Sequence, residues 1–192
     1  MGAGRPPYRR RRLSADGHEL RLAVNYLAPA LPARRLTPAL RDGAPARIVN
    51  VGSVGQAPVD FADPRMDAGY SGAQAYYRSK FALAAFTFDL AGELASDGIT
   101  VNCLHPATFM NTHMAREAMM PPMSTVGTGA KAVLNLAAGP AGGAVTGRYF
   151  DGESEARAHE GTYDPAIRAR LRTLTAELLA PFLGDDARSG VR

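Results

Sequence analysis

Short apolar runs alternate with longer segments of helical periodicity along most of the chain. Three such runs predict β-strands, at residues 46–51, 99–104 and 146–150. Helices are expected after each of them, at residues 72–96, 128–138 and 165–179. The first two runs, ARIVNV and ITVNCL, are nearly all apolar, which is typical of parallel strands buried on both faces. Strands separated by helices of this length indicate βαβ units, and therefore an α/β fold with a parallel sheet.

The segment before the first strand carries both helix-forming and helix-breaking signals. Asp16 is a candidate N-cap, with Glu19 three residues later as its capping-box partner, and apolar residues follow at helical spacing. Proline has no amide proton to donate and clashes with the preceding turn of a helix. We therefore expect a kink or a break where the prolines fall, at positions 29, 32 and 38.

The composition is that of one folded domain of moderate size. The chain has 192 residues, of which 46% are apolar and 21% charged, and these values exclude wholesale disorder. No run approaches 18 uninterrupted apolar residues, so no membrane span is expected. The single cysteine, Cys103, has no internal partner for a disulfide and fits a reducing compartment, so a cytoplasmic protein is expected.

The positive charge is concentrated at the N-terminus. Five arginines lie in the first twelve residues, and subtracting them from the formal net charge of +4 leaves −1 for the rest. We therefore divide the chain into a basic, irregular tail at residues 1–12, a domain at 13–183 and a second tail at 184–192. Such a tail can bind nucleic acid or anionic lipid. Without an aromatic platform or zinc-finger spacing, a solvated tail is the favoured interpretation, and nucleic acid is not an expected partner.

The most informative pair of polar residues is Tyr76 and Lys80, one helical turn apart in the predicted long helix. A free phenol titrates near pH 10, and an ammonium held nearby lowers its pKa. A tyrosine tuned in this way can donate a proton to a carbonyl oxygen or accept one from an alcohol. For the pair taken alone, two residues on an exposed helix surface are the favoured interpretation.

Polar residues also follow the first two predicted strands. Ser53 comes directly after the first strand, and His105-Pro106-Ala107-Thr108 follows the second. Open α/β sheets bind ligands at the carboxyl ends of their strands, so these groups and the Tyr76 helix are expected to converge on one crevice. The four histidines and the cysteine lack metal-ligand spacing, so no metal site is expected.

Four motifs in the same order make the sequence similar to the short-chain dehydrogenase/reductase family, and more loosely to its retinol-dehydrogenase-like branch. They are the helix asparagine in AVNYL (Asn25), the strand-end serine in VNVGS (Ser53), the Tyr-x-x-x-Lys pair (Tyr76 and Lys80) and the strand end VNCLHPA. The resemblance covers about residues 13–179. Within it, Gly52 stands where the family has a first, non-catalytic serine.

The resemblance implies an NAD(P)-dependent oxidoreductase in which each motif has a task. Tyr76 is implied to be the acid–base, and Lys80 to lower its pKa and to hydrogen-bond the nicotinamide ribose. Ser53 is implied to orient and polarise the substrate carbonyl or hydroxyl. Asn25 is implied to hold a water that relays protons through Lys80.

The resemblance also implies the ligands. Tyr76, Lys80, Pro106 and Thr108 are the implied contacts of the cofactor, which is NAD or NADP. An apolar alcohol, aldehyde or ketone is the expected substrate. Family members place a mobile substrate lid where this chain has its methionine-rich segment, residues 110–123, although methionines also serve as ordinary packing residues.

The chain departs from the family mainly at its beginning. No glycine-rich turn between a strand and a helix precedes the Ser53 strand, and such a turn normally holds the pyrophosphate. We therefore expect the C-terminal part of a doubly wound, Rossmann-like fold, truncated at the N-terminus and lacking the first strands and the phosphate loop. The edge of the Ser53 strand is then open, which favours self-association. The resemblance implies a homo-oligomer formed through the helices of Asn25 and Tyr76.

Two functions therefore remain open at this stage. The first is hydride transfer between nicotinamide and an alcohol or carbonyl compound. The second is that of a catalytically inactive remnant that acts as a binding or oligomerising partner. Cofactor binding distinguishes the two.

Overall fold

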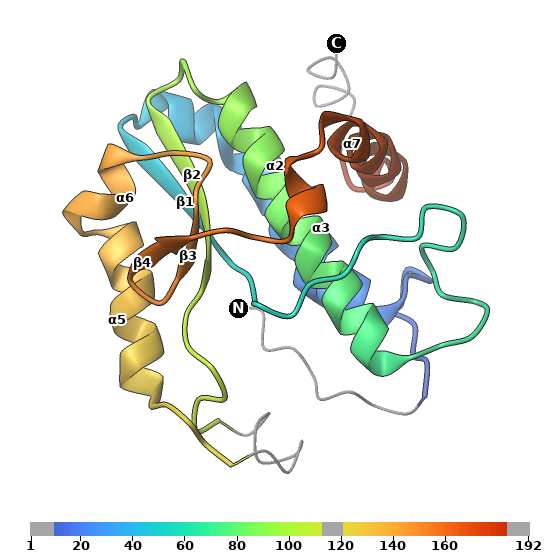
Figure 1. Ribbon diagram of the computed structural model, residues 1–192. Coiled ribbons are helices and arrows are strands. Elements are labelled where there is room, and N and C mark those ends of the chain that lie inside the picture. The colour runs from blue at the N-terminus through green and yellow to red at the C-terminus, as the bar shows by residue number, and fades with distance from the viewer. Residues whose placement is uncertain (1–9, 113–120, 184–192) are drawn as a thin grey trace.

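The computed structural model describes residues 10–112 and 121–183, which form a sheet covered by helices on both faces (Figure 1). The sheet has four strands in the order β1 (Ala46–Val51), β2 (Ile99–His105), β3 (Tyr149–Asp151) and β4 (Ser154–Ala156). The first three strands are parallel, and β4 pairs antiparallel to β3. The predicted α/β fold with a largely parallel sheet is confirmed. The short antiparallel hairpin at its edge was not predicted.

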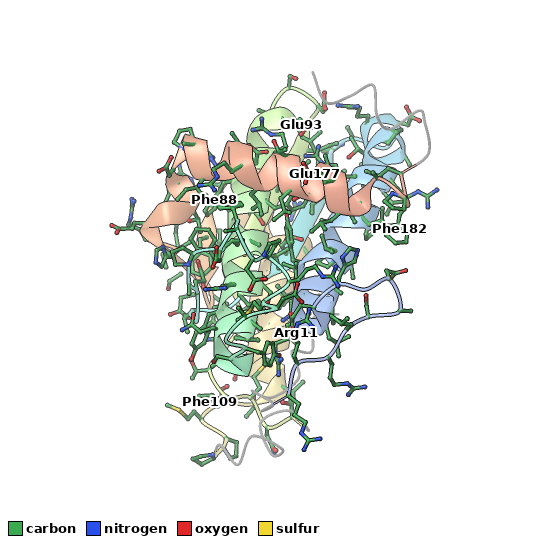
Figure 2. All side chains as sticks on the ribbon, turned by 90° about the vertical axis from the view of Figure 1, so that its right-hand side faces the viewer. Arg11, Phe88, Glu93, Phe109, Glu177 and Phe182 are labelled. Atoms are coloured by element: carbon green, nitrogen blue, oxygen red, sulfur yellow. The ribbon has the colours of Figure 1, made fainter. Side chains whose placement is uncertain are left out.

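Helices from the two halves of the chain cover opposite faces of the sheet. One face carries the continuous run α1 (Leu20–Leu22), η1 (Ala23–Leu27) and α2 (Ala28–Asp42), together with α3 (Gly72–Glu93). The other face carries α5 (Val126–Ala137) and α6 (Pro140–Ala144). The 3-10 helix η2 (Glu160–Tyr163) leads into α7 (Pro165–Leu179), which lies across the outer side of α3 (Figure 2).

The long helix α3 is the centre of the main core. It begins after Ser71, whose hydroxyl accepts a hydrogen bond from the Gln74 amide, and it is buried along most of its length. Small alanines let it approach β2 closely, while Phe81 packs against His159 beside η2 and Phe86 packs against Tyr26 of η1. Because packing fixes this helix on several sides, the side chains that it presents at the sheet edge are held firmly.

The structure corrects two expectations about the N-terminal segment. The N-cap is Glu19, not Asp16, because the Glu19 carboxylate accepts the amides of Arg21 and Leu22 and is itself buried. Pro32 and Pro38 lie inside α2, so of the expected kink or break the break is wrong. The helix changes to π-helical winding over Ala23–Leu27 before the first proline, and its inner face remains packed in the core.

Several predicted boundaries also shift. α3 ends at Glu93 rather than at residue 96, α5 begins two residues early after its N-cap Thr125, and β3 begins at Tyr149 rather than at residue 146. Such differences arise because capping and pairing, which depend on neighbours in space, decide where an element ends.

Strand β1 lies at the edge of the sheet. In residues 10–112 and 121–183 no strand pairs with its outer side, and most of its side chains are half-buried. The prediction that this strand is buried on both faces is therefore wrong for the described structure, whereas β2 is buried almost throughout. The end of the basic N-terminal segment contacts the domain, since Arg11 binds the carboxylate of Asp67 and the carbonyl of Arg65. No described helix is long and apolar enough to cross a membrane.

Candidate active site

The carboxyl ends of β1, β2 and β3 meet beside the first turns of α3. Ser53 follows β1, His105 ends β2 and Asp151 ends β3, while Tyr76 and Lys80 come from α3. The structure thus brings together the strand-end serine and the helix pair that sequence patterns singled out.

The loop after β1 fixes Ser53 through its own hydrogen bonds. The Ser53 Oγ accepts the Gly55 amide at 3.1 Å, so the hydroxyl proton is available to a further acceptor. The Gln56 side chain donates to the Ser53 carbonyl at 2.7 Å and accepts the amide of His159 at 3.1 Å. Gln56 therefore ties the serine loop to the segment after β4. Sequence reasoning missed this residue, and its only signal was a polar side chain just after a strand end.

Tyr76 lies next to Ser53, and its electrostatics differ from the prediction. Burial raises the pKa of Tyr76 above its ordinary value of 10.0, and a side-chain hydrogen bond with Ser53 opposes this rise. The expectation that Lys80 lowers the pKa of this phenol is wrong for the structure. Its Nζ lies 5.9 Å from the centre of the Tyr76 ring and is directed at a backbone carbonyl instead. Tyr76 is therefore a protonated phenol at neutral pH, suited to donating its proton.

Lys80 is nearly enclosed, with only 2% of its surface exposed. Its Nζ donates to the carbonyl of Val51 at 2.8 Å. Burial lowers its pKa from 10.5 to about 8, with Cys103 acting in the opposite direction. An amine that can lose its proton near neutral pH is able to take part in proton transfer.

Asn25 lies in the π-helical stretch and is connected to α3 rather than to Lys80. Its Nδ2 donates to the hydroxyl of Ser79 at 3.0 Å, and that hydroxyl donates to the Tyr76 carbonyl at 2.7 Å. Asn25 thereby links its helix to α3 at the backbone carbonyl of Tyr76, and it is buried.

The loop after β2 carries the two remaining predicted residues. Pro106 is buried, whereas Thr108 is half-buried, and its hydroxyl lies 3.0 Å from His105 Nε2. The hydroxyl of Ser124 donates to the Thr108 carbonyl at 2.6 Å. These contacts hold Thr108 at the edge of the sheet where Tyr76 and Lys80 also lie. From the sequence, His105 was considered as a polar residue at the strand end and as a metal ligand, but its contact with Thr108 was not predicted.

The other candidates do not form a second site. Cys103 is buried in the core under α3, which raises the pKa of its thiol. Among the described residues no group of histidines, cysteines and carboxylates is placed to hold a metal ion. Of the methionine-rich segment, Met110 and Met123 are described, and Met123 is exposed beside the exposed Phe109. Met114, Met119 and Met120 lie outside the described residues.

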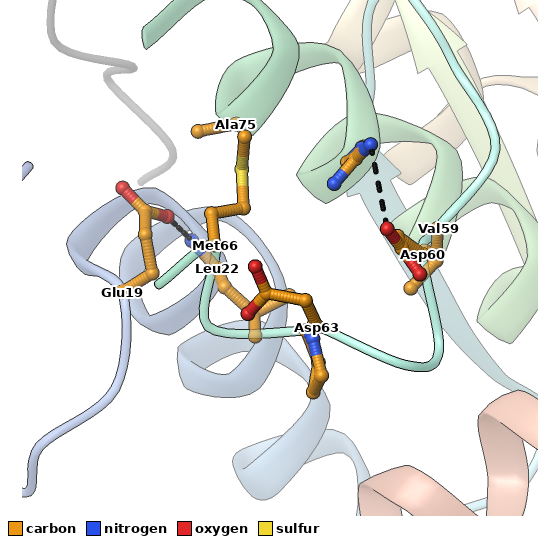
Figure 3. Close-up of a pocket in the computed structure, with 9 residues that line it drawn as sticks. Glu19, Leu22, Val59, Asp60, Asp63, Met66 and Ala75 are labelled. Atoms are coloured by element: carbon orange, nitrogen blue, oxygen red, sulfur yellow. Dashed lines mark hydrogen bonds and ion pairs between the residues drawn. The ribbon is translucent and has the colours of Figure 1, made fainter. Parts of the chain in front are cut away.

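A pocket elsewhere on the molecule is lined by acidic side chains that already have hydrogen-bond or ion-pair partners. It lies between the start of α1, α3 and the preceding loop, and Met66 projects into it (Figure 3). Each acidic group that lines it has a partner: Glu19 caps α1, Asp60 pairs with Arg78 at 4.0 Å, and Asp63 accepts two backbone amides that lower its pKa. The pocket contains none of the predicted site residues.

Comparison with known proteins supports the lineage. A family model described as short chain dehydrogenase matches residues 2–121. A Streptomyces antibioticus protein named "Probable oxidoreductase" is 38% identical over 174 residues, which is 80% of this chain and 58% of that protein. Retinol dehydrogenase 13 of Mus musculus is 31% identical over 182 residues, covering 85% of this chain and 54% of that protein. The chain thus spans little more than half the length of these relatives.

Solved structures agree on the fold. A Mycobacterium paratuberculosis protein superposes with a TM-score of 0.68 at 22% identity, covering 89% of this chain and 62% of that one. The 3-ketoacyl-(acyl-carrier-protein) reductase of Brucella melitensis, solved with NADH, gives a TM-score of 0.57 at 23% identity and covers 79% and 62%. At these identities the likeness concerns the fold alone.

Proposed function

The chain belongs to the short-chain dehydrogenase family, with retinol-dehydrogenase-like relatives, and on that basis we propose that it is an NAD(P)-dependent oxidoreductase. It would transfer hydride between a nicotinamide and an alcohol or carbonyl substrate. The observation that carries this proposal is that Ser53 lies close enough to the Tyr76 phenol to oppose the rise of its pKa, with Lys80 one turn along the same helix. These are the donor groups that a carbonyl oxygen needs when it becomes an alcohol.

The proposal assigns a proton-handling role to each of these side chains. Tyr76 gives its phenolic proton to the substrate oxygen during reduction and takes it back during oxidation. Ser53 donates its hydroxyl proton to the same oxygen and so stabilises the negative charge that develops there. Lys80, with its lowered pKa, returns a proton to Tyr76. Asn25 keeps the Tyr76 turn in place through Ser79.

The residues at the sheet edge fit the nicotinamide end of the cofactor. Lys80 has ammonium protons beyond the one directed at Val51, and the Thr108 hydroxyl lies at the same edge. We propose that Tyr76, Lys80, Pro106 and Thr108 hold the nicotinamide and its ribose. When bound, the nicotinamide supplies or accepts the hydride. The described part of the chain contains no glycine-rich turn opening a helix after a strand, so the pyrophosphate contacts would come from elsewhere.

The proposed substrate is a small apolar alcohol, aldehyde or ketone. The exposed apolar side chains of Phe109 and Met123, next to the Thr108 loop, support an apolar entrance. We also propose a cytoplasmic homo-oligomer that pairs through the helices of Asn25 and Tyr76. The exposed Val24 and Tyr77 on these helices are consistent with such a contact.

The test is consumption of NADH or NADPH by the purified chain in the presence of an apolar aldehyde. Tyr76→Phe removes only the phenolic oxygen and is expected to reduce kcat by about 10²–10⁴-fold. Tyr77→Phe is the matched control, because its ring lies beside that of Tyr76 but its hydroxyl has no role in the proposal. Equal turnover by wild type and Tyr76→Phe would refute the assignment.

A second function is favoured by the open edge of β1. If the chain does not bind the cofactor, it would act as an inactive partner that pairs with another polypeptide through this edge. Fluorescence titration with NADH separates the two proposals. Saturable binding supports the oxidoreductase, whereas no binding to a folded chain supports the inactive partner.

A further inference from the structure

His105 occupies the last position of β2 and is 7% exposed. Its side chain lies on the α3 face of the sheet, and its register partner on β3 is Asp151. The charged groups that act on it are Asp151 from β3 and Lys80 from α3, and Cys103 with its register partner Tyr149 lies two positions earlier along the same strands. The proposed reaction assigns no task to this histidine.

The contact between His105 and Thr108 depends on the charge of the ring. Its Nε2 lies 3.0 Å from the Thr108 hydroxyl. A neutral imidazole that carries its proton on Nδ1 accepts the hydroxyl proton at Nε2, whereas an imidazolium can only donate. The Thr108 backbone is held by Ser124, so the hydroxyl can redirect its proton without moving the loop.

We propose that His105 is a positioning residue that controls where the Thr108 hydroxyl donates and places a second positive charge near Lys80 when it is protonated. The proposal rests on the proposed function in one respect, namely that Thr108 contacts the cofactor. When His105 is neutral, the hydroxyl proton of Thr108 is directed at its ring. When His105 is protonated, that hydroxyl proton is free to reach an acceptor on the bound nicotinamide, and cofactor binding becomes stronger.

Opposing neighbours set the pH at which this change occurs. Burial lowers the pKa of His105 below 6.5, Asp151 raises it and Lys80 lowers it further. The proton is therefore taken up on the acid side of pH 6.5. Removing the charge of Lys80 should raise the midpoint, and removing that of Asp151 should lower it, because each neighbour acts directly on the imidazolium.

The first experiment needs no turnover. NMR titration of the whole chain should show the Thr108 amide and methyl signals following the ionisation of the His105 ring with one midpoint. Lys80→Met should move that midpoint up, and Asp151→Asn should move it down. His105→Gln should abolish the Thr108 titration, whereas His18→Gln, at a remote position, should preserve it. Thr108 signals that stay constant while His105 titrates would overturn the inference.

The second experiment separates the inference from the proposed function. NADH affinity, measured by fluorescence above and below the His105 midpoint, should be about two- to tenfold tighter below it, as expected for one added hydrogen bond. His105→Gln should remove this pH dependence. Binding that is equally tight on both sides of the midpoint overturns the inference and leaves the proposed function intact. Absence of NADH binding at any pH refutes the proposed function, and the NMR titration then decides the inference.

Discussion

Lys80→Met should make the protein more stable at neutral pH while removing its activity. Lys80 is buried in α3, and its ammonium donates a hydrogen bond to the Val51 carbonyl. Methionine has a similar length and no charge, so it fills the same space without requiring a buried ammonium.

The magnitude follows from the pKa of the amine. A fall from 10.5 to about 8 corresponds to about 3 kcal/mol that opposes the charged form in the folded protein. The lost hydrogen bond to Val51 offsets about 1 kcal/mol of this. Lys80→Met is therefore expected to raise the free energy of unfolding by about 2 kcal/mol at pH 7.

The sign of the pH dependence gives a second check. Because the pKa of Lys80 is lower in the folded chain, the unfolded chain binds more protons between about pH 8 and 10.5. Wild-type stability should therefore rise through this window, and the advantage of Lys80→Met should shrink.

Urea unfolding followed by circular dichroism at pH 7 and at pH values within that window measures both effects. Lys131→Met is the matched control, because Lys131 is the only other lysine and is exposed, paired with Glu153 on the surface. A Lys80→Met chain that is less stable than wild type at pH 7 would refute the reasoning. A free energy of unfolding that depends on pH in the same way in wild type and in Lys80→Met would also refute it.

Three further outcomes follow from the site and the sheet edge. Gly52→Ser should destabilise the chain by about 1–3 kcal/mol, because a Cβ there would lie 2.6 Å from the Cys103 sulfur. Adding Cys103→Ala to this variant should restore most of the lost stability, as measured by thermal melts. Ser53→Ala should raise the pKa of Tyr76 further, as seen by NMR of ring-labelled tyrosine; an unchanged value would show that the Ser53 hydrogen bond is absent. The open β1 edge should cause self-association in sedimentation experiments, and a cooperatively melting monomer would argue against it.

Local patterns were sufficient for the elements that build the site. The apolar run before Ser53, the run before His105 and the alanine-rich helix of Tyr76 carry their own signals in composition and spacing. Because α3 follows β1 and its first turns lie at the edge where the parallel strands end, the meeting of Ser53 and Tyr76 followed from topology.

The parts that were wrong depend on three-dimensional neighbours. Glu19 replaces Asp16 as the N-cap because Tyr70 also donates to its carboxylate from a distant loop. The effect of Lys80 on Tyr76 could not be inferred from helical spacing, since the Val51 carbonyl on a separate strand draws the ammonium away. Contacts made across long separations in sequence have no signal in a local pattern.

Transfer of deuterium from C4-labelled NADH or NADPH to an apolar aldehyde, followed by mass spectrometry of the alcohol, tests the assignment of the site most directly. We predict labelled alcohol from the wild-type chain and a loss of about 10²–10⁴-fold in Tyr76→Phe, with Tyr77→Phe close to wild type. Labelled alcohol formed equally fast by Tyr76→Phe, or none from a folded chain that binds the cofactor, would contradict the account.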